Sequence, residues 1–221
     1  MVQIPGGSFV MGGGEEADEQ PAHRVFVSAF SIDRDEVTEA EYAQCVAKKK
    51  CAPHQFVETG NLPVTNVSFE EAQTFCRSLG KRLPTEAEWE RAARGDDGRI
   101  FPWGNQPDCM QANFGNFEGE GRCPQNPGRP VAVGSFAGAS PFGVRDLAGN
   151  VWEWVADRYQ KDYYAISPAK DPSGPARGAL RSVRSGACCS MFGLPRAQNR
   201  LAFPPEYRDI DLGFRCAASK N

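Results

Sequence analysis

The chain has 221 residues and a formal net charge of -3, with 40% hydrophobic and 24% charged residues. This length suits one large domain, so we take residues 1–221 as a single domain. The acidic balance argues against a nucleic-acid-binding surface, which needs a basic patch. No apolar run approaches the roughly 20 residues that span a bilayer, and we expect any export signal to lie outside this sequence.

Three helices are predicted from one pattern in their first turns. Thr38, Ser68 and Thr85 are each followed three residues later by a glutamate, and such a pair satisfies the free amides of a helix start reciprocally. Glycines at 80 and 95 suit the left-handed position that ends a helix. Spacing of three and four residues gives each helix an inward stripe. The expected inward residues are Tyr42, Cys45 and Val46, then Phe69, Ala72, Cys76 and Leu79, then Trp89, Ala92 and Ala93.

The rest of the chain is expected to form short strands and much ordered irregular backbone. The 23 glycines and 17 prolines are spread along the sequence, which is typical of such a fold. Strands are predicted at residues 9–11, 25–32, 151–155, 180–184 and 213–217. The stretch 95–135 has almost no periodicity, and a long stretch of this kind needs something to hold it. A disulfide between Cys109 and Cys123 or a bound cation would do so.

Eight cysteines are present, with no C-x-x-C pair and only two histidines. This pattern argues against a structural zinc site and favours disulfides. Cys45 and Cys51 flank a short turn, so a local bridge is expected there as well. Disulfides indicate an oxidising compartment, and we therefore expect an extracytoplasmic location, either periplasmic or secreted.

Several blocks resemble one family: IPGGSFVMG at the start, then RLPTEAEWE, then GNVWEW, then LGFRCA near the end. They resemble the formylglycine-generating-enzyme, or sulfatase-modifying-factor, family. The resemblance implies an α+β class: an elaborated C-type-lectin-like fold with small twisted antiparallel sheets, about three short helices and abundant ordered loop. It also implies a disulfide between Cys76 and Cys216. Because this fold hosts unrelated functions, function has to be argued from the site.

The resemblance places the catalytic centre after Arg184. Active members of the family carry two cysteines five positions apart in this segment, and the soft thiolates bind copper. Aligning Arg184 with the family's arginine puts Ser190 and Pro195 at those positions. Neither side chain can supply a thiolate. We therefore expect no copper, and the alternative function, an oxidoreductase that converts a substrate cysteine to formylglycine, rests on the family resemblance alone.

Two adjacent cysteines, Cys188 and Cys189, lie in the same segment. One interpretation is a reactive thiol, or a metal site with Met191 as a soft neighbour. The other is structural, with one thiol buried and the second exposed or joined to it in a vicinal disulfide. Adjacent residues of an extended chain point to opposite faces, and free cysteine is often buried, so we favour the structural interpretation.

The resemblance also implies calcium. The family binds calcium at the turn that corresponds to GNVWEW, which predicts Asn150 and Glu153 as ligands with the carbonyls of Gly149 and Val151. Calcium requires six to eight oxygen ligands. A second family site would use Asn113 and the Phe114 carbonyl, but its usual downstream aspartate falls near Cys123. The alternative for Asn150 and Glu153 is hydrogen bonding that stabilises the turn without a metal, and we favour calcium at the first site only.

A binding surface is predicted in the loop segment 188–211. Apolar and aromatic side chains on ordered loops are common anchors for partners, although the same side chains could simply cap the core. The residues concerned are Met191, Phe192, Leu194, Leu201, Phe203 and Tyr207. We accordingly expect a non-catalytic module that binds a protein or small ligand and is often fused to another domain. Arg82, Glu86, Glu88 and Arg215 are expected to form one buried ion-pair network.

Overall fold

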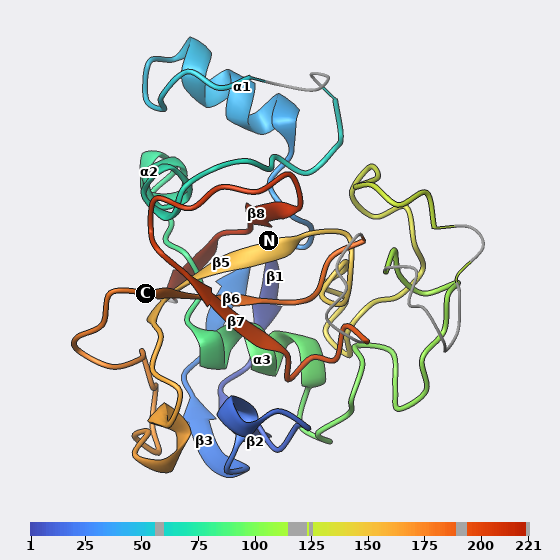
Figure 1. The fold of residues 1–221 in the computed structure, drawn as a ribbon, viewed down its shortest axis with the longest axis vertical. Coiled ribbons are helices and arrows are strands. Elements are labelled where there is room, and N and C mark those ends of the chain that lie inside the picture. The colour runs from blue at the N-terminus through green and yellow to red at the C-terminus, as the bar shows by residue number, and fades with distance from the viewer. Residues whose placement is uncertain (56–59, 115–122, 124–125, 189–193, 220–221) are drawn as a thin grey trace.

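A computed structural model of the chain describes residues 1–55, 60–114, 123, 126–188 and 194–219. Within these residues it contains three α-helices, two short 3-10 helices and nine strands in three sheets. The predicted α+β class with small sheets is therefore confirmed. Figure 1 shows the largest sheet between α2 and α3, with long irregular loops beside it.

The helices are α1 (Glu39–Ala47), α2 (Phe69–Ser78) and α3 (Glu86–Arg94). Each begins with the predicted capping box, in which the glutamate accepts a hydrogen bond from the cap amide at 2.8–2.9 Å. Gly80 follows α2 with φ 71°, and Gly95 caps α3 with φ 64°. These are the left-handed positions that glycine adopts without strain, so both predicted ends are confirmed.

One expectation about helix faces is wrong, and another is correct but incomplete. Leu79, expected on the inward stripe of α2, is the C-cap residue and is 53% exposed, while Phe75 is buried instead. All nine residues of α3 are buried, including its charged ones. A single apolar stripe does not describe α3, because neighbouring elements surround the helix on every side.

The nine strands form sheets of three, two and four strands. The three-stranded sheet has the order β1 (Val2–Ile4), β4 (Phe30–Ile32), β9 (Ala217–Ser219), and the hairpin pairs β2 (Gly7–Met11) with β3 (His23–Val27). The four-stranded sheet has the order β7 (Arg200–Phe203), β6 (Arg181–Arg184), β5 (Trp152–Arg158), β8 (Leu212–Phe214). The short helices are η1 (Ala17–Glu19) and η2 (Tyr163–Ala165).

The predicted strands 25–32 and 213–217 each divide into two strands that belong to different sheets. Strands β1 and β7 were not predicted. Strand β7 is a correction to the expected irregular segment 188–211, because four of its residues pair with β6. Pairing with a strand distant in sequence is not visible in a local pattern.

The four-stranded sheet has two chemically different faces. Trp154, Val183 and Leu201 are cross-strand partners on one face, and they belong to the apolar core that includes Phe69 and Phe75 of α2. Side chains alternate between faces along a strand, so Glu153, Arg184 and Arg200, which are also cross-strand partners, lie on the other face. That charged face packs on α3, and it positions the site described below.

The structure contains the three expected disulfides: Cys45–Cys51, Cys76–Cys216 and Cys109–Cys123. Cys76–Cys216 joins α2 to the chain between β8 and β9, across 140 residues of sequence. The described part of 95–135 has no helix or strand, and Cys109–Cys123 holds it as predicted.

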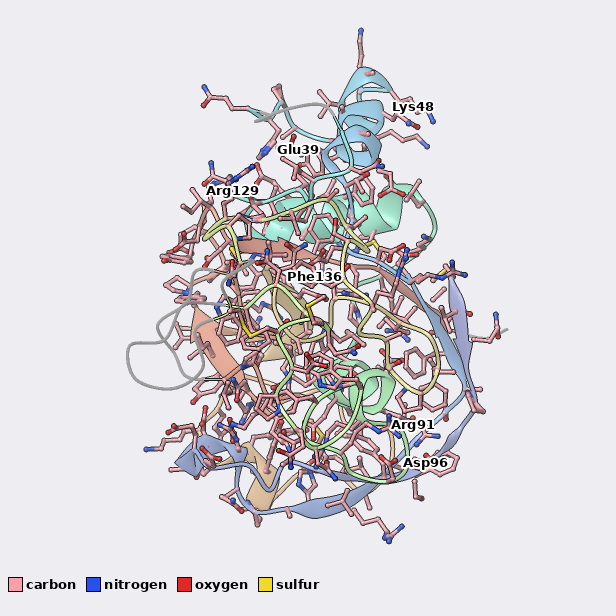
Figure 2. The ribbon with its side chains drawn as sticks, turned by 90° about the vertical axis from the view of Figure 1, so that its right-hand side faces the viewer. Glu39, Lys48, Arg91, Asp96, Arg129 and Phe136 are labelled. Carbon is pink, nitrogen blue, oxygen red and sulfur yellow. A yellow bond between two sulfur atoms is a disulfide. The ribbon has the colours of Figure 1, made fainter. Side chains whose placement is uncertain are left out.

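The lysine run after α1 is exposed. Figure 2 shows Lys48 at the outer end of this helix, where a cation faces the negative end of the helix dipole. Within the described residues, the helices are too short or too polar to cross a membrane.

Candidate functional site

The segment expected to carry chemistry is held at both ends by a layer of buried ion pairs. Arg184 donates from Nη2 to Glu90 Oε2 at 2.7 Å and from Nη1 to Glu86 Oε1 at 3.1 Å. Arg200, its cross-strand partner, donates to both oxygens of Glu86 at 3.0 and 2.9 Å. Burial alone would raise the pKa of Glu86, but Arg200 and Arg184 hold it below its usual value. This layer fixes where the chain leaves and re-enters the sheet.

Pro195, which the family resemblance aligns with the second cysteine of active members, is buried. A Cβ atom added to Gly186 would lie 2.7 Å from Pro195 Cβ, so the proline ring packs directly on that backbone. The next residue, Arg196, pairs with the buried Glu19 at 2.8 Å. At this position the chain therefore presents a packed hydrocarbon ring and no ligand for a metal.

Ser190, which the resemblance aligns with the first cysteine of active members, lies outside the described residues, as does Cys189. Cys188 is fully buried and is not a free thiol. Of the two interpretations of the adjacent cysteines, burial of Cys188 agrees with the structural one.

Four of the six predicted binding residues lie within the described structure, and all four are half-buried. Leu201, Phe203 and Tyr207 pack against the core shared with α2. Phe203 stacks on Tyr207 with ring centroids 4.3 Å apart. Leu194 packs, together with the half-buried Trp103, against a separate small core. The four side chains thus cap the core and also retain exposed area; Met191 and Phe192 lie outside the described residues.

The side chain of Asn150, a predicted calcium ligand, is bound on both sides by protein. Its Oδ1 accepts from Val131 N at 3.0 Å and from Asn113 Nδ2 at 3.2 Å. Its Nδ2 donates to Glu36 Oε2 at 2.7 Å and to Val131 O at 3.3 Å. Asn150 has φ 59°, a conformation that asparagine tolerates better than most residues. The contacts of Asn150 agree with the alternative interpretation, in which its side chain stabilises the turn by hydrogen bonds and binds no metal.

The carboxylate of Glu153, the second predicted ligand, is also occupied. It accepts from Arg215 Nε and Nη2, both at 2.7 Å, and from Trp89 Nε1 at 2.9 Å. Glu153 and Arg215 are both 0% exposed. Neither Asn150 nor Glu153 therefore fits calcium as arranged here, and the described residues contain no group of three acidic, cysteine or histidine side chains arranged to hold a metal ion.

The expectation that Arg82, Glu86, Glu88 and Arg215 form a single ion-pair network is also wrong. Arg215 pairs with Glu153, Arg82 pairs with Glu88 at 2.6 Å near the surface, and Glu86 pairs with the arginines of β6 and β7. The four residues fall into three groups because they enter the fold from different faces of α3 and of the sheet.

Asn113 differs from the other predicted calcium ligands. Its Oδ1 is buried and accepts no hydrogen bond from the described residues, while its Nδ2 is bound to Arg129 O at 3.0 Å. The neighbouring Phe114 carbonyl accepts from Asn126 Nδ2. A buried oxygen without a donor is costly, so the Asn113 side chain fits a cation better than Asn150 does. The carbonyls of Gly149 and Val151 were predicted only as accessory ligands.

Two further buried carboxyl groups near this turn were missed by the sequence reasoning. Burial raises the pKa of Glu36 well above its usual value, with Asp146 and Glu153 acting in the same direction. Burial likewise raises the pKa of Asp146. The three carboxyl groups share Arg215 as a cation. Glu36 precedes the helix signal at Thr38 and Asp146 precedes GNVWEW, and neither spacing marks them as neighbours.

Known proteins resemble this chain over almost its full length. The family model of the sulfatase-modifying factor enzyme 1-like domain matches residues 1–220. Serine/threonine-protein kinase pkn1 of Chlamydia caviae is 33% identical over 98% of this chain, which spans only 37% of the kinase. The formylglycine-generating enzyme of Streptomyces coelicolor is 31% identical, covering 98% of this chain and 88% of the enzyme.

Two more similarities bear on the site. The inactive C-alpha-formylglycine-generating enzyme 2 of Mus musculus is 32% identical, covering 99% of this chain and 85% of that protein. The solved structure of PvdO from Pseudomonas aeruginosa superposes with a TM-score of 0.82 at 27% identity, covering 99% of this chain and 93% of that one. The proteins similar to this chain thus include one named as a formylglycine-generating enzyme and one named as an inactive form of that enzyme.

Proposed function

The chain belongs to the family of the sulfatase-modifying factor enzyme 1-like domain, and on this premise we propose that it is a non-catalytic member that binds a protein or small ligand. The observation that carries the proposal is Pro195, which packs on Gly186 where active members need a thiolate. Soft Cu(I) requires thiolate or thioether ligands. A proline ring offers none, so the copper-dependent chemistry has no centre.

The half-buried strip along β7 supports the binding role. Leu201, Phe203 and Tyr207 rest on the core and keep part of their surface exposed. Side chains held in place in this way lose little conformational entropy when a partner covers them. Beside them Arg181 lies over the Phe69 ring, 4.0 Å from its centroid, which adds a cation to an otherwise apolar strip.

The decisive experiment loads the purified chain with Cu(I) and incubates it with a cysteine peptide of the CxPxR type in air. Mass spectrometry should detect no conversion of thiol to aldehyde. The matched positive control is the formylglycine-generating enzyme of Streptomyces coelicolor under the same conditions. Aldehyde formation by this chain would establish the alternative oxidoreductase function and remove the non-catalytic proposal.

The proposed function includes a structural calcium ion, which we place at Asn113 and not at Asn150 and Glu153. Asn113 Oδ1 is the ligand favoured by the unpartnered buried oxygen, in place of the occupied side chains of Asn150 and Glu153. The Phe114 carbonyl, which accepts from Asn126 Nδ2, would have to exchange that hydrogen bond for the ion. Calcium would cross-link loop segments there and would stabilise the native state by mass action. The Asn113→Ala variant should lose any difference in melting temperature between calcium and EDTA, and a retained difference would place calcium elsewhere.

An extracytoplasmic location and a larger parent protein complete the proposal. Three disulfides within one chain favour an oxidising compartment. The kinase relative, of which this chain matches about a third, supports fusion to other domains. Free-thiol counting on protein isolated from its native host, without reductant, tests the first point.

A further inference from the structure

Two arginines face each other across strands β5 and β6, and neither forms an ion pair within the described residues. Arg158 and Arg181 are cross-strand partners, and both side chains are half-buried. In the described part of the chain, every other buried or half-buried arginine forms an ion pair with an aspartate or a glutamate. This pair of arginines is therefore an exception that needs an explanation.

The protein uses one hydrogen-bond donor of each guanidinium group. Arg181 donates from Nη1 to the Ala156 carbonyl at 3.0 Å, and Arg158 donates from Nη1 to the Gly178 carbonyl. A guanidinium group has five N–H donors. None of the described residues accepts a second hydrogen bond from either side chain. Both groups thus keep donors for a ligand.

The positive charge of the pair is not balanced from within the sheet. Like charges directly opposite each other destabilise a sheet, and burial together with Arg158 lowers the pKa of Arg181. Two carboxyl groups, Asp157 and Glu70, act in the other direction. Burial raises the pKa of Asp157 well above its usual value, and this carboxyl accepts from Glu86 N on the opposite face of the sheet. Glu70 is exposed on α2. An incoming carboxylate would therefore relieve the repulsion between the two arginines.

Two aromatic rings continue the same row onto β7. Phe203 is the cross-strand partner of Arg181, and it stacks on Tyr207. Strands β5, β6 and β7 are neighbours in the four-stranded sheet (Figure 1). With strands about 4.8 Å apart, the midpoint of the arginine pair lies about 7 Å from Phe203 along the row. Residues two positions apart in an extended peptide lie on one face with a similar separation of about 7 Å.

We propose that this row binds an acidic segment of a partner protein. An aspartate or glutamate of the segment contacts Arg158 and Arg181, and an apolar side chain two positions away packs on Phe203 and Tyr207. Arginine suits this role because its planar group can donate to both oxygens of a carboxylate. The proposal rests on the binding role proposed above for the strip along β7, and it adds the class of partner.

The test is a titration of the ¹⁵N-labelled chain with the capped peptide Ac-GESFG-NH₂, followed at the backbone amides of β6 and β7 and at the arginine Nε signals. We expect saturable binding with a dissociation constant on the order of 1 mM, as suits a short peptide with one charge-assisted contact. Ac-GQSFG-NH₂ lacks the charge and Ac-GESGG-NH₂ lacks the ring, so each should bind at least about fivefold more weakly. Inorganic sulfate, which has charge but no apolar group, should also bind more weakly.

Matched variants assign the carboxylate contact to the arginine pair. Arg158→Gln and Arg24→Gln change the net charge equally, but Arg24 is exposed on β3, in a different sheet. We expect Arg158→Gln to weaken binding of Ac-GESFG-NH₂ about fivefold or more, and Arg24→Gln to leave it unchanged. Arg158→Glu places a carboxylate of the protein itself opposite Arg181. The melting temperature of this variant should rise, since opposite charges across a sheet are stabilising, while binding of the acidic peptide is lost.

The outcomes separate this proposal from the proposed function. The acidic partner would be overturned by absence of saturation with Ac-GESFG-NH₂, by equal binding of the glutamine peptide or of sulfate, by equal effects of the two glutamine variants, or by retained binding in Arg158→Glu. Each of these results leaves the non-catalytic assignment in place. Aldehyde formation in the copper assay would instead remove that assignment without changing the peptide titration.

Discussion

Replacing Glu153 with glutamine is the sharpest test of how the GNVWEW turn works. The carboxylate sits between Arg215 and Trp89, with three hydrogen bonds of 2.7–2.9 Å and no exposure. Glutamine keeps the shape and one acceptor but removes the charge. Arg215 would then remain buried opposite a neutral amide. Breaking a buried ion pair in this way costs about 3–5 kcal/mol.

Urea unfolding followed by tryptophan fluorescence measures this loss, in excess calcium and in excess EDTA. If Glu153 serves Arg215, Glu153→Gln should lose the same free energy of unfolding in both solutions. The double variant Glu153→Gln with Arg215→Met removes the charge that Glu153 neutralised, but it also removes the cation that Glu36 and Asp146 face. It should therefore recover part of the loss, about 1–2 kcal/mol, relative to the single variant. Trp89 keeps its acceptor in both proteins.

One result of this experiment would refute the assignment of Glu153 to Arg215. A loss confined to the calcium solution, with no recovery in the double variant, would mean that Glu153 ligates calcium as the sequence resemblance first implied. The ion pair with Arg215 would then be secondary, and our reassignment of the calcium proposal to Asn113 would fail with it.

Three further predictions follow from other parts of the structure. Removing the Cys76–Cys216 bridge by a double alanine substitution should cost about 5 kcal/mol in the chain-entropy model, since it closes a loop of 140 residues; a loss under about 1 kcal/mol in urea unfolding would contradict this. Burial raises the pKa of Asp211 to about 6, so the native state favours its protonated form, and stability should fall as pH rises through that value. After allowance for solvent screening of this half-buried group, the fall is about 1 kcal/mol, and Asp211→Asn should abolish it in melts between pH 4 and pH 8. Finally, the wild-type chain should bind no Cu(I) in competition with a chelator, whereas Ser190→Cys with Pro195→Cys should gain binding; tight stoichiometric binding by the wild type would refute the reasoning.

The helices and their ends could be predicted because their determinants are local. A capping box needs only two side chains three positions apart, so Thr38, Ser68 and Thr85 identified three helix starts correctly. The ends of α2 and α3 could be predicted at Gly80 and Gly95 for the same reason, because a glycine at a positive φ ends a helix locally. The sequence could not reveal that α3 is buried on every side, because that depends on strands drawn from both halves of the chain.

The family blocks also carried the fold class, the Cys76–Cys216 pairing and the absence of thiols at Ser190 and Pro195, all of which depend on residue identity at aligned positions. What only the tertiary structure decided was which polar groups meet. Glu153 and Arg215 are 62 residues apart in sequence and share two hydrogen bonds in the core. A carboxylate in sequence is equally a metal ligand or an ion-pair partner, because both roles use the same oxygens. The choice depends on which donor the folded chain brings within about 3 Å, and that distance is set by long-range packing.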